Sequence, residues 1–143
     1  MGTYTETYRG AIYPWHCDHQ GHLTVMHYFG FFDHAAWQFS TAMGFGPSRL
    51  KAEARGFVDV KASVEYLAEQ HAGEVIHIES ALRRIGTTSL VLHHRMLNSE
   101  TGELAATLEA VMLYFDLTAR SKLPLSSEDK TRLAQFLVEE TAV

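Results

Sequence analysis

The sequence predicts an α+β fold in which an antiparallel sheet of about five strands wraps around one long apolar helix. Apolar side chains over residues 28–43 recur at three- and four-residue steps, which is typical of one helix face. Residues 58–66 alternate apolar and polar side chains, as a strand does. The later strands follow one another closely, which favours antiparallel neighbours because parallel strands need long crossovers.

The first half of the chain predicts a strand, a loop and the helix. Residues 3–12 alternate in polarity and predict a half-buried strand that ends before Pro14. Residues 15–27 are rich in histidine and irregular in pattern, which predicts a loop. The helix follows over residues 28–43 and is expected to stop at Gly44. Its apolar stripe is wide, so we expect the sheet to enclose it.

The second half predicts four strands and a short helix. The strands are expected over residues 58–66, 76–83, 90–97 and 105–115. Ser126 and Asp129 resemble a capping box, and the apolar spacing after them predicts an amphipathic helix reaching Glu140. Both parities of the last strand are largely apolar. We therefore expect a second subunit to cover the face of the sheet away from the helix, in a homo-oligomer that is a dimer or a tetramer.

Length and composition narrow the class of protein. The chain has 143 residues, 46% of them hydrophobic and 20% charged, which predicts a single domain over residues 1–143. The lone Cys17 cannot form an internal disulfide, so we expect a cytoplasmic location. A formal net charge of −5 argues against nucleic acid or an anionic membrane as partner. No apolar run is long enough for a membrane span, and the first residues do not resemble a signal peptide.

Histidines gather in the segment around Cys17 and Asp18. They are His16, His19, His22, His27 and His34. Three of them lie at three-residue steps in an irregular loop, which defines no tetrahedral site, so we expect neither a metal nor another cofactor. A nucleophilic Cys17 is a second hypothesis. Neighbouring residues of an extended segment point in opposite directions, however, so Cys17 and Asp18 cannot both face one site.

Asp18 supports a third hypothesis. It precedes Gly21 and the start of a largely buried helix, where free backbone N–H groups can bind an oxyanion. A carboxylate in that position can activate water or attack directly, which outlines an acyl-transfer or hydrolysis site. The alternative is an aspartate that only caps the helix or a turn.

A family resemblance favours the chemical role. Residues 15–29 are similar to the pattern D-x-x-G-H-V-N-x-x-x-Y of hotdog-fold acyl-CoA thioesterases of the 4-hydroxybenzoyl-CoA thioesterase type. Asp18, Gly21, His22 and Tyr28 match it. Leu23 is a conservative variant, and Thr24 stands where many members have Asn. The family shares the order of strand, long helix and four strands over nearly the whole chain.

The resemblance implies a role for each matching position. Asp18 is implied as the catalytic carboxylate, either as general base or as nucleophile in a mixed anhydride. The backbone N–H of Val25 would stabilise the thioester oxyanion, and His22 is a candidate for orienting Asp18. Gly21, which shapes the turn, and Tyr28 are implied on the substrate side. Arg120 and Lys122, which occupy the position of a basic pair in the family, are the candidates for binding the phosphates of CoA.

The expected activity is hydrolysis of an acyl-CoA thioester to the free acid and CoA. Two alternatives remain. One is a dehydratase or hydratase of acyl thioesters with the same fold, and the other is a non-catalytic module that holds an acyl or aromatic ligand beside the helix. Release of free thiol from acyl-CoA separates the first hypothesis from the other two.

Overall fold

The computed structural model, which describes residues 2–139, contains one antiparallel sheet with the strand order β1-β3-β4-β5-β2 and a short β6 paired with β5. The strands are β1 (Thr5–Ala11), β2 (Arg55–Tyr66), β3 (Val75–Ile85), β4 (Ser89–Asn98), β5 (Leu104–Asp116) and β6 (Ser121–Lys122). The α-helices are α1 (Val25–Ala42), α2 (Pro47–Glu53) and α3 (Ser127–Leu133). Short 3-10 turns cover Pro14–His16 and Ala134–Phe136. The predicted α+β architecture is confirmed.

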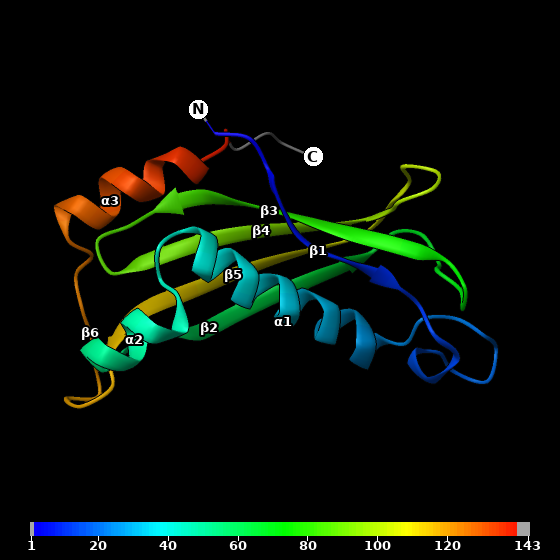
Figure 1. The fold of residues 1–143 in the computed structure, drawn as a ribbon, viewed down its shortest axis with the longest axis horizontal. Coiled ribbons are helices and arrows are strands. Elements are labelled where there is room, and N and C mark those ends of the chain that lie inside the picture. Colours follow the sequence, from blue (N-terminus) through cyan, green and yellow to red (C-terminus); the bar gives the residue numbers. More distant parts are fainter. Residues whose placement is uncertain (1, 140–143) are drawn as a thin grey trace.

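Helix α1 lies across one face of the curled sheet (Figure 1) and packs against β1 and β3. Its buried stripe is Tyr28, Phe31, Phe32, Ala35, Phe39 and Ser40. Two expectations need correction. The helix begins at Val25 rather than at residue 28, because its first turn points to solvent and shows no apolar period. The sheet does not enclose it either, since Phe29 and Trp37 are 41% and 59% exposed on the flank that α1 turns away from the core.

Strand β2 carries a bulge that corrects the predicted facing of its side chains. The pairing with β5 shifts register between Asp59 and Lys61. Asp59 therefore pairs with Met112, whose side chain is buried, and faces the helix side of the sheet. Val58 pairs with Leu113 and faces the other side. A strict alternation places these two residues the other way round, because it cannot anticipate the extra residue of a bulge.

Helix α2 was not predicted from the sequence. It packs against α3 through Arg49. Its guanidinium donates two hydrogen bonds of 3.0 Å to the carboxylate of Asp129. Burial raises the pKa of Asp129, but hydrogen bonds from Arg49, Arg132 and Ser126 outweigh it and lower the pKa to about 2. The predicted cap of α3 is confirmed, since Ser126 Oγ accepts from the N–H of Asp129 at 3.0 Å. The helix ends earlier than predicted, and Glu140 lies outside the described residues.

The face of the sheet that points away from α1 is less apolar than the sequence of β5 predicts. On this face Val111 and Leu113 of β5 are half-buried, while Glu109 and Thr107 are polar. The expected second subunit on this face stays a prediction. Within the described residues, no helix is both long enough and apolar enough to cross a membrane.

A buried polar network links three strands under α1. His94 of β4 is 1% exposed, and its Nδ1 lies 2.5 Å from Ser80 Oγ of β3. Ser80 Oγ in turn lies 2.7 Å from Thr7 Oγ1 of β1. Burial and then the neighbouring His93 lower the pKa of His94 to about 4. The imidazole is thus neutral in the folded protein at neutral pH, with its ring among Phe32 and Phe39.

This network predicts a loss of stability in mild acid. The unfolded chain binds a proton at His94 below about pH 6.5, whereas the folded chain resists doing so down to about pH 4. The free energy of unfolding should therefore fall as the pH is lowered through this window. His94 alone should contribute a loss of about 2 kcal/mol between pH 7 and pH 5.

Urea unfolding of wild type and His94→Gln at both pH values measures this contribution. The variant should lose about 2 kcal/mol less than wild type between the two pH values. The exposed His19 gives a matched control, since His19→Gln should keep the wild-type pH dependence. An unchanged pH dependence in His94→Gln would contradict the prediction.

Candidate active site

Asp18 lies in a tight turn of the loop between β1 and α1. Cys17 and Leu23 form an isolated antiparallel bridge that closes the base of this turn. Asp18 N–H donates to His22 O at 2.9 Å, and Gly21 N–H donates to Asp18 O at 3.0 Å. Gly21 has φ +82°, a left-handed conformation that glycine adopts without strain. The turn therefore depends on a glycine at the position that the sequence pattern singled out.

The carboxylate of Asp18 is held by its own turn and open to solvent. Its Oδ1 accepts from Gln20 N–H at 2.9 Å and from His22 N–H at 3.2 Å. The hydrogen bond from His22, then the one from Gln20, lowers the pKa of Asp18 despite a small opposing effect of burial. The group is thus an oriented, ionised carboxylate at neutral pH. This geometry fits both a turn cap and a base or nucleophile.

His22 meets Asp18 through its backbone rather than its ring. The ring stacks edge-on against His71, with 4.9 Å between centroids, and its Nε2 lies 3.4 Å from Glu69 Oε2. The N–H that orients Asp18 is a main-chain group, which any residue other than proline supplies. The orienting role of the His22 side chain stays a prediction.

The first turn of α1 offers free backbone donors. Thr24, at the N-cap, provides no side-chain cap, and the N–H groups of His27 and Tyr28 donate to its carbonyl. In the described part of the chain, no hydrogen bond uses the N–H of Val25 or Met26. Both residues are exposed, so these donors at the positive end of an 18-residue helix are open to a ligand.

Tyr28 is part of the core. It is 5% exposed, packs edge-on against Tyr66 and points its hydroxyl at Ala68 O, 3.5 Å away. This placement fits an anchor for the start of α1. A substrate contact by Tyr28 stays a prediction.

The structure disfavours Cys17 as the nucleophile. Burial and then the nearby charge of Asp18 raise the pKa of the Cys17 thiol, which keeps it protonated. Its Sγ points toward Tyr13 O at 3.6 Å. The His16 ring packs against His27 and Phe31, and its Nδ1 accepts from Tyr13 N–H, so it does not converge with His19 on one point.

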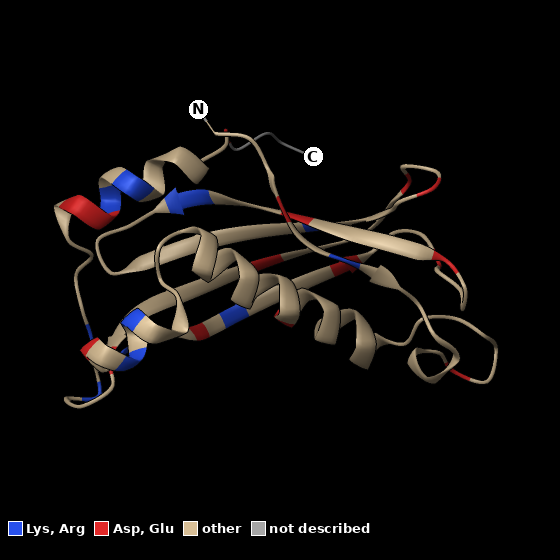
Figure 2. Ribbon diagram, viewed as in Figure 1, with Lys and Arg blue, Asp and Glu red and all other residues tan. Residues whose placement is uncertain are grey.

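Arg120 and Lys122 lie far from Asp18 within one chain. They follow β5 in the turn and in β6, at the left end of Figure 1, whereas the Asp18 loop is at the right end. Both side chains are exposed, and the Arg120 guanidinium lies over the Phe115 ring. Figure 2 shows Lys and Arg gathered toward the end of the molecule that holds β6, while the end that holds the Asp18 loop carries acidic residues in this view. One chain therefore does not bring the predicted phosphate contacts to the predicted catalytic group.

A groove separates α1 from β2. It forms a cavity of about 660 Å³ between the exposed flank of α1, α2 and the first half of β2, with Trp37, Leu50 and Phe57 among its apolar walls. Two acids, Asp33 and Asp59, also line it. Burial and then the charge of Asp33 raise the pKa of Asp59. Sequence reasoning missed both acids, because only the bulge turns Asp59 toward the groove and Asp33 sits beside an apolar stripe.

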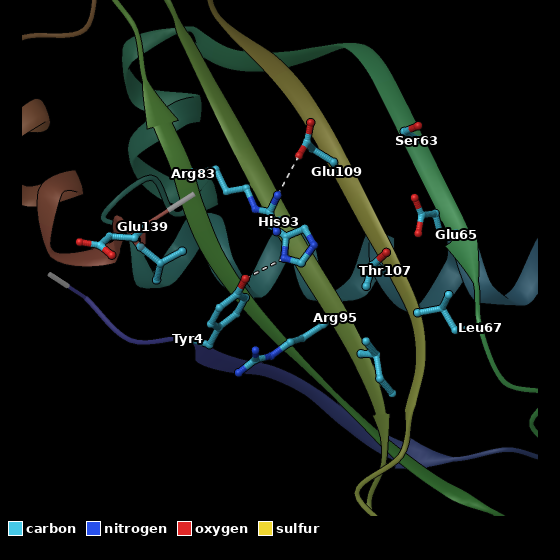
Figure 3. A pocket seen from close by; sticks show the side chains of 12 residues that line it. Tyr4, Ser63, Glu65, Leu67, Arg83, His93, Arg95, Thr107, Glu109 and Glu139 are labelled. Carbon is cyan, nitrogen blue, oxygen red and sulfur yellow. Dashed lines mark hydrogen bonds and ion pairs between the residues drawn. The ribbon is translucent and has the colours of Figure 1, made fainter. Parts of the chain in front are cut away.

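A second cavity of about 560 Å³ lies on the opposite face of the sheet (Figure 3). Its walls include Arg83, which lies 3.5 Å from Glu109, and His93, whose Nδ1 is 2.8 Å from Tyr4 Oη. Burial, and then Arg83 and Arg95, lower the pKa of His93 to about 4. Arg83 pairs with Glu109 across this cavity, and Glu65 and Glu139 also line it, so its walls carry no net positive charge.

Comparison with known proteins adds to this geometry. Residues 12–137 match the model of the thioesterase-like superfamily. A hypothetical protein from Staphylococcus aureus, characterised in complex with CoA, superposes with a TM-score of 0.87 at 18% identity, covering 98% of this chain and 89% of the other. A 1,4-dihydroxy-2-naphthoyl-CoA thioesterase from Synechocystis gives 0.77 at 16% identity, with 89% and 93% coverage.

A third structure, a gentisyl-coenzyme A thioesterase, gives a TM-score of 0.76 at 22% identity, with 89% and 98% coverage. No curated protein matches the sequence significantly. At these identities the structural neighbours establish the shared fold. Since the family model spans most of the chain, the resemblance seen in the motif around Asp18 is confirmed, and this chain belongs to the thioesterase-like superfamily with the hotdog fold.

Proposed function

We propose that this protein hydrolyses acyl-CoA thioesters, with Asp18 as the group that activates water or attacks the thioester. The observation that carries the proposal is the Asp18 turn, which fixes an ionised carboxylate through two backbone donors and leaves it open to solvent. Membership of the thioesterase-like superfamily supports this chemistry. The CoA complex and the CoA thioesterases among the structural neighbours support CoA as the thiol part of the substrate.

The start of α1 supplies the second part of the proposed site. Hydrolysis of a thioester passes through a tetrahedral intermediate with a negative oxygen, which backbone N–H groups stabilise well. We assign this role to the N–H of Val25, with that of Met26 beside it. Thr24 leaves both donors uncapped, and the dipole of the long helix adds a favourable field.

Asp18 can act by either of two routes from this position. As general base it takes a proton from water, which then attacks the thioester carbonyl. As nucleophile it forms a mixed anhydride with release of the CoA thiolate, and water hydrolyses that anhydride. Both routes end in the same acid and free CoA, and both need the ionised carboxylate.

Asp18→Asn should abolish thiol release from a panel of aromatic and aliphatic acyl-CoAs. The amide preserves the size of the side chain and its ability to accept the two backbone hydrogen bonds, but it can neither take a proton nor attack. We expect a loss of at least a factor of about 100 in kcat with little change in CoA binding. Retention of most of kcat would remove Asp18 from the mechanism. Ligand binding without thiol release in wild type would favour a non-catalytic module.

We further propose that the site is shared between two copies of the chain. Strand β2 is an edge strand of 12 residues, and its exposed apolar side chains include Val60 and Tyr66. Such an edge is prone to pair with another strand. β2 begins beside Asp116, near Arg120, and ends near Gln70, whose carbonyl accepts from Leu23 N–H in the Asp18 loop.

Antiparallel pairing of two β2 strands around a two-fold axis therefore has a direct consequence. It places the Arg120 end of one copy next to the Asp18 end of the other. The basic residues absent from the Asp18 end in Figure 2 would then come from the second copy, as would part of the groove beside α1.

The free thiol of Cys17 is consistent with the expected cytoplasmic location.

Sedimentation should give at least a dimer, larger than the 16.1 kDa chain. Val60→Lys should shift the protein toward monomer and lower activity, because Val60 is 55% exposed on the edge strand and adds nothing to the core of one chain. Val75→Lys, at an exposed position of β3, is the matched control and should leave the assembly unchanged. A fully active wild-type monomer would contradict the shared site.

Replacement of Arg120 and Lys122 by alanine should mainly raise KM for acyl-CoA. Phosphate contacts far from the thioester contribute nearly equally to substrate and transition state, so kcat should change less. Two exposed contacts suggest a loss of about tenfold in kcat/KM. A truncated thioester without the nucleotide phosphates should be turned over by the variant almost as by wild type. Equal losses on both substrates would show that the phosphates bind elsewhere, with Arg83 and Arg84 as the next candidates.

A further inference from the structure

A cluster of metal-ligating side chains lies beside the Asp18 turn and is not used in the proposed hydrolysis. It consists of His22 at the end of the turn and of Glu69 and His71 in the connection between β2 and β3. One ligand atom from each of the three residues lies within 4.8 Å of the others. Within the cluster, His22 Nε2 lies 3.4 Å from Glu69 Oε2.

The backbone fixes this arrangement. His22 and His71 face each other across an isolated antiparallel bridge. Leu23 N–H donates to Gln70 O at 2.9 Å, and Ala72 N–H donates to Gly21 O at 3.4 Å. The two segments are therefore bonded together on both sides of the histidine pair. The three side chains converge because the main chain holds them there.

A second observation concerns the partner of His71. Its Nδ1 lies 2.6 Å from Glu74 Oε1, and Glu74 Oε2 accepts a hydrogen bond of 2.7 Å from Asn98 Nδ2. Asn98 is 4% exposed, so this support is anchored in the body of the protein. Histidines that bind metal commonly make such a contact with a carboxylate, which sets the ring orientation and raises the basicity of the nitrogen that faces the metal. Glu74 at Nδ1 leaves Nε2 of His71 for an ion.

We propose that His22, Glu69 and His71 form a binding site for a divalent transition-metal ion of the Zn²⁺ type. Two imidazoles and one carboxylate suit Zn²⁺ and similar ions, whereas Mg²⁺ and Ca²⁺ require mainly oxygen ligands. In a tetrahedral Zn²⁺ site the ligand atoms lie roughly 3.3 Å apart. The three ligand atoms here lie within 4.8 Å of one another, so side-chain rotations that move them by about an ångström or two complete the site. Water takes the fourth position.

Such an ion would join two segments of the chain next to the proposed catalytic group. His22 N–H donates to Asp18 Oδ1, so an ion on the His22 ring holds the same residue that orients the carboxylate. The ion would fasten the Asp18 turn to the β2–β3 connection without binding Asp18 itself. Binding of the ion is independent of the proposed hydrolysis, and its test needs no enzyme assay.

Titration calorimetry with Zn²⁺ on chelator-treated protein tests the site. Wild type should bind one ion per chain at this site. Glu69→Gln and His71→Ala should each weaken binding by at least a factor of about ten, and Glu74→Gln by about tenfold through the lost support of His71. His19→Ala is the matched control, because His19 is an exposed histidine of the same turn outside the cluster, and it should bind Zn²⁺ like wild type.

Two further measurements make the result specific. Co²⁺ should give the visible absorption of a tetrahedral site in wild type and in His19→Ala, but not in His71→Ala, and Mg²⁺ should not compete. Thermal unfolding of each variant without metal checks that it is folded. If His71→Ala is not folded, Glu69→Gln alone carries the test. Wild-type affinity in both Glu69→Gln and His71→Ala, an equal loss in His19→Ala, or equal binding of Mg²⁺ would each overturn the proposal.

Discussion

The apolar stripe of α1 must be buried, and the sheet buries it by curling around only part of the helix. α1 packs mainly against β1 and β3, and near its start Tyr28 also meets Tyr66 of the edge strand β2. Two features follow from this packing. The first residues of α1 are exposed with their backbone donors uncapped, and a groove opens between its exposed flank and β2. The uncapped donors and the groove therefore both arise where the burial of α1 is incomplete.

The same packing separates the charges along the molecule. The Asp18 loop lies at one end of the strands and the turn with Arg120 lies at the other end. The full length of β2 and β5 therefore separates them. A protein with net charge −5 repels CoA at long range and has to bind it through a few close cations. With the cations at the wrong end of one chain, a second copy that runs in the opposite direction is the simplest way to bring them to the thioester.

The acidic end is also where the chain collects imidazoles. Asp18, Glu69 and Glu74 surround His22 and His71, which makes this end unfavourable for phosphate and favourable for a cation. The hydrogen-bonded turn and the histidine pair share the main chain of His22. An ion at the proposed site would thus act on the same residue that orients Asp18.

The sequence by itself determined the order of the long helix and the five longer strands, the buried stripe of α1, the capped start of α3 and the turn that holds Asp18. These depend on local patterns, namely helical and strand periods, a serine three residues before a carboxylate, and a glycine where φ is positive. Only the tertiary structure decided the bulge of β2, the ion pair that docks α2, the distance of Arg120 from Asp18 and the meeting of His22 with Glu69 and His71. Each of these is set by pairing and packing between residues far apart in the chain, which no local pattern contains.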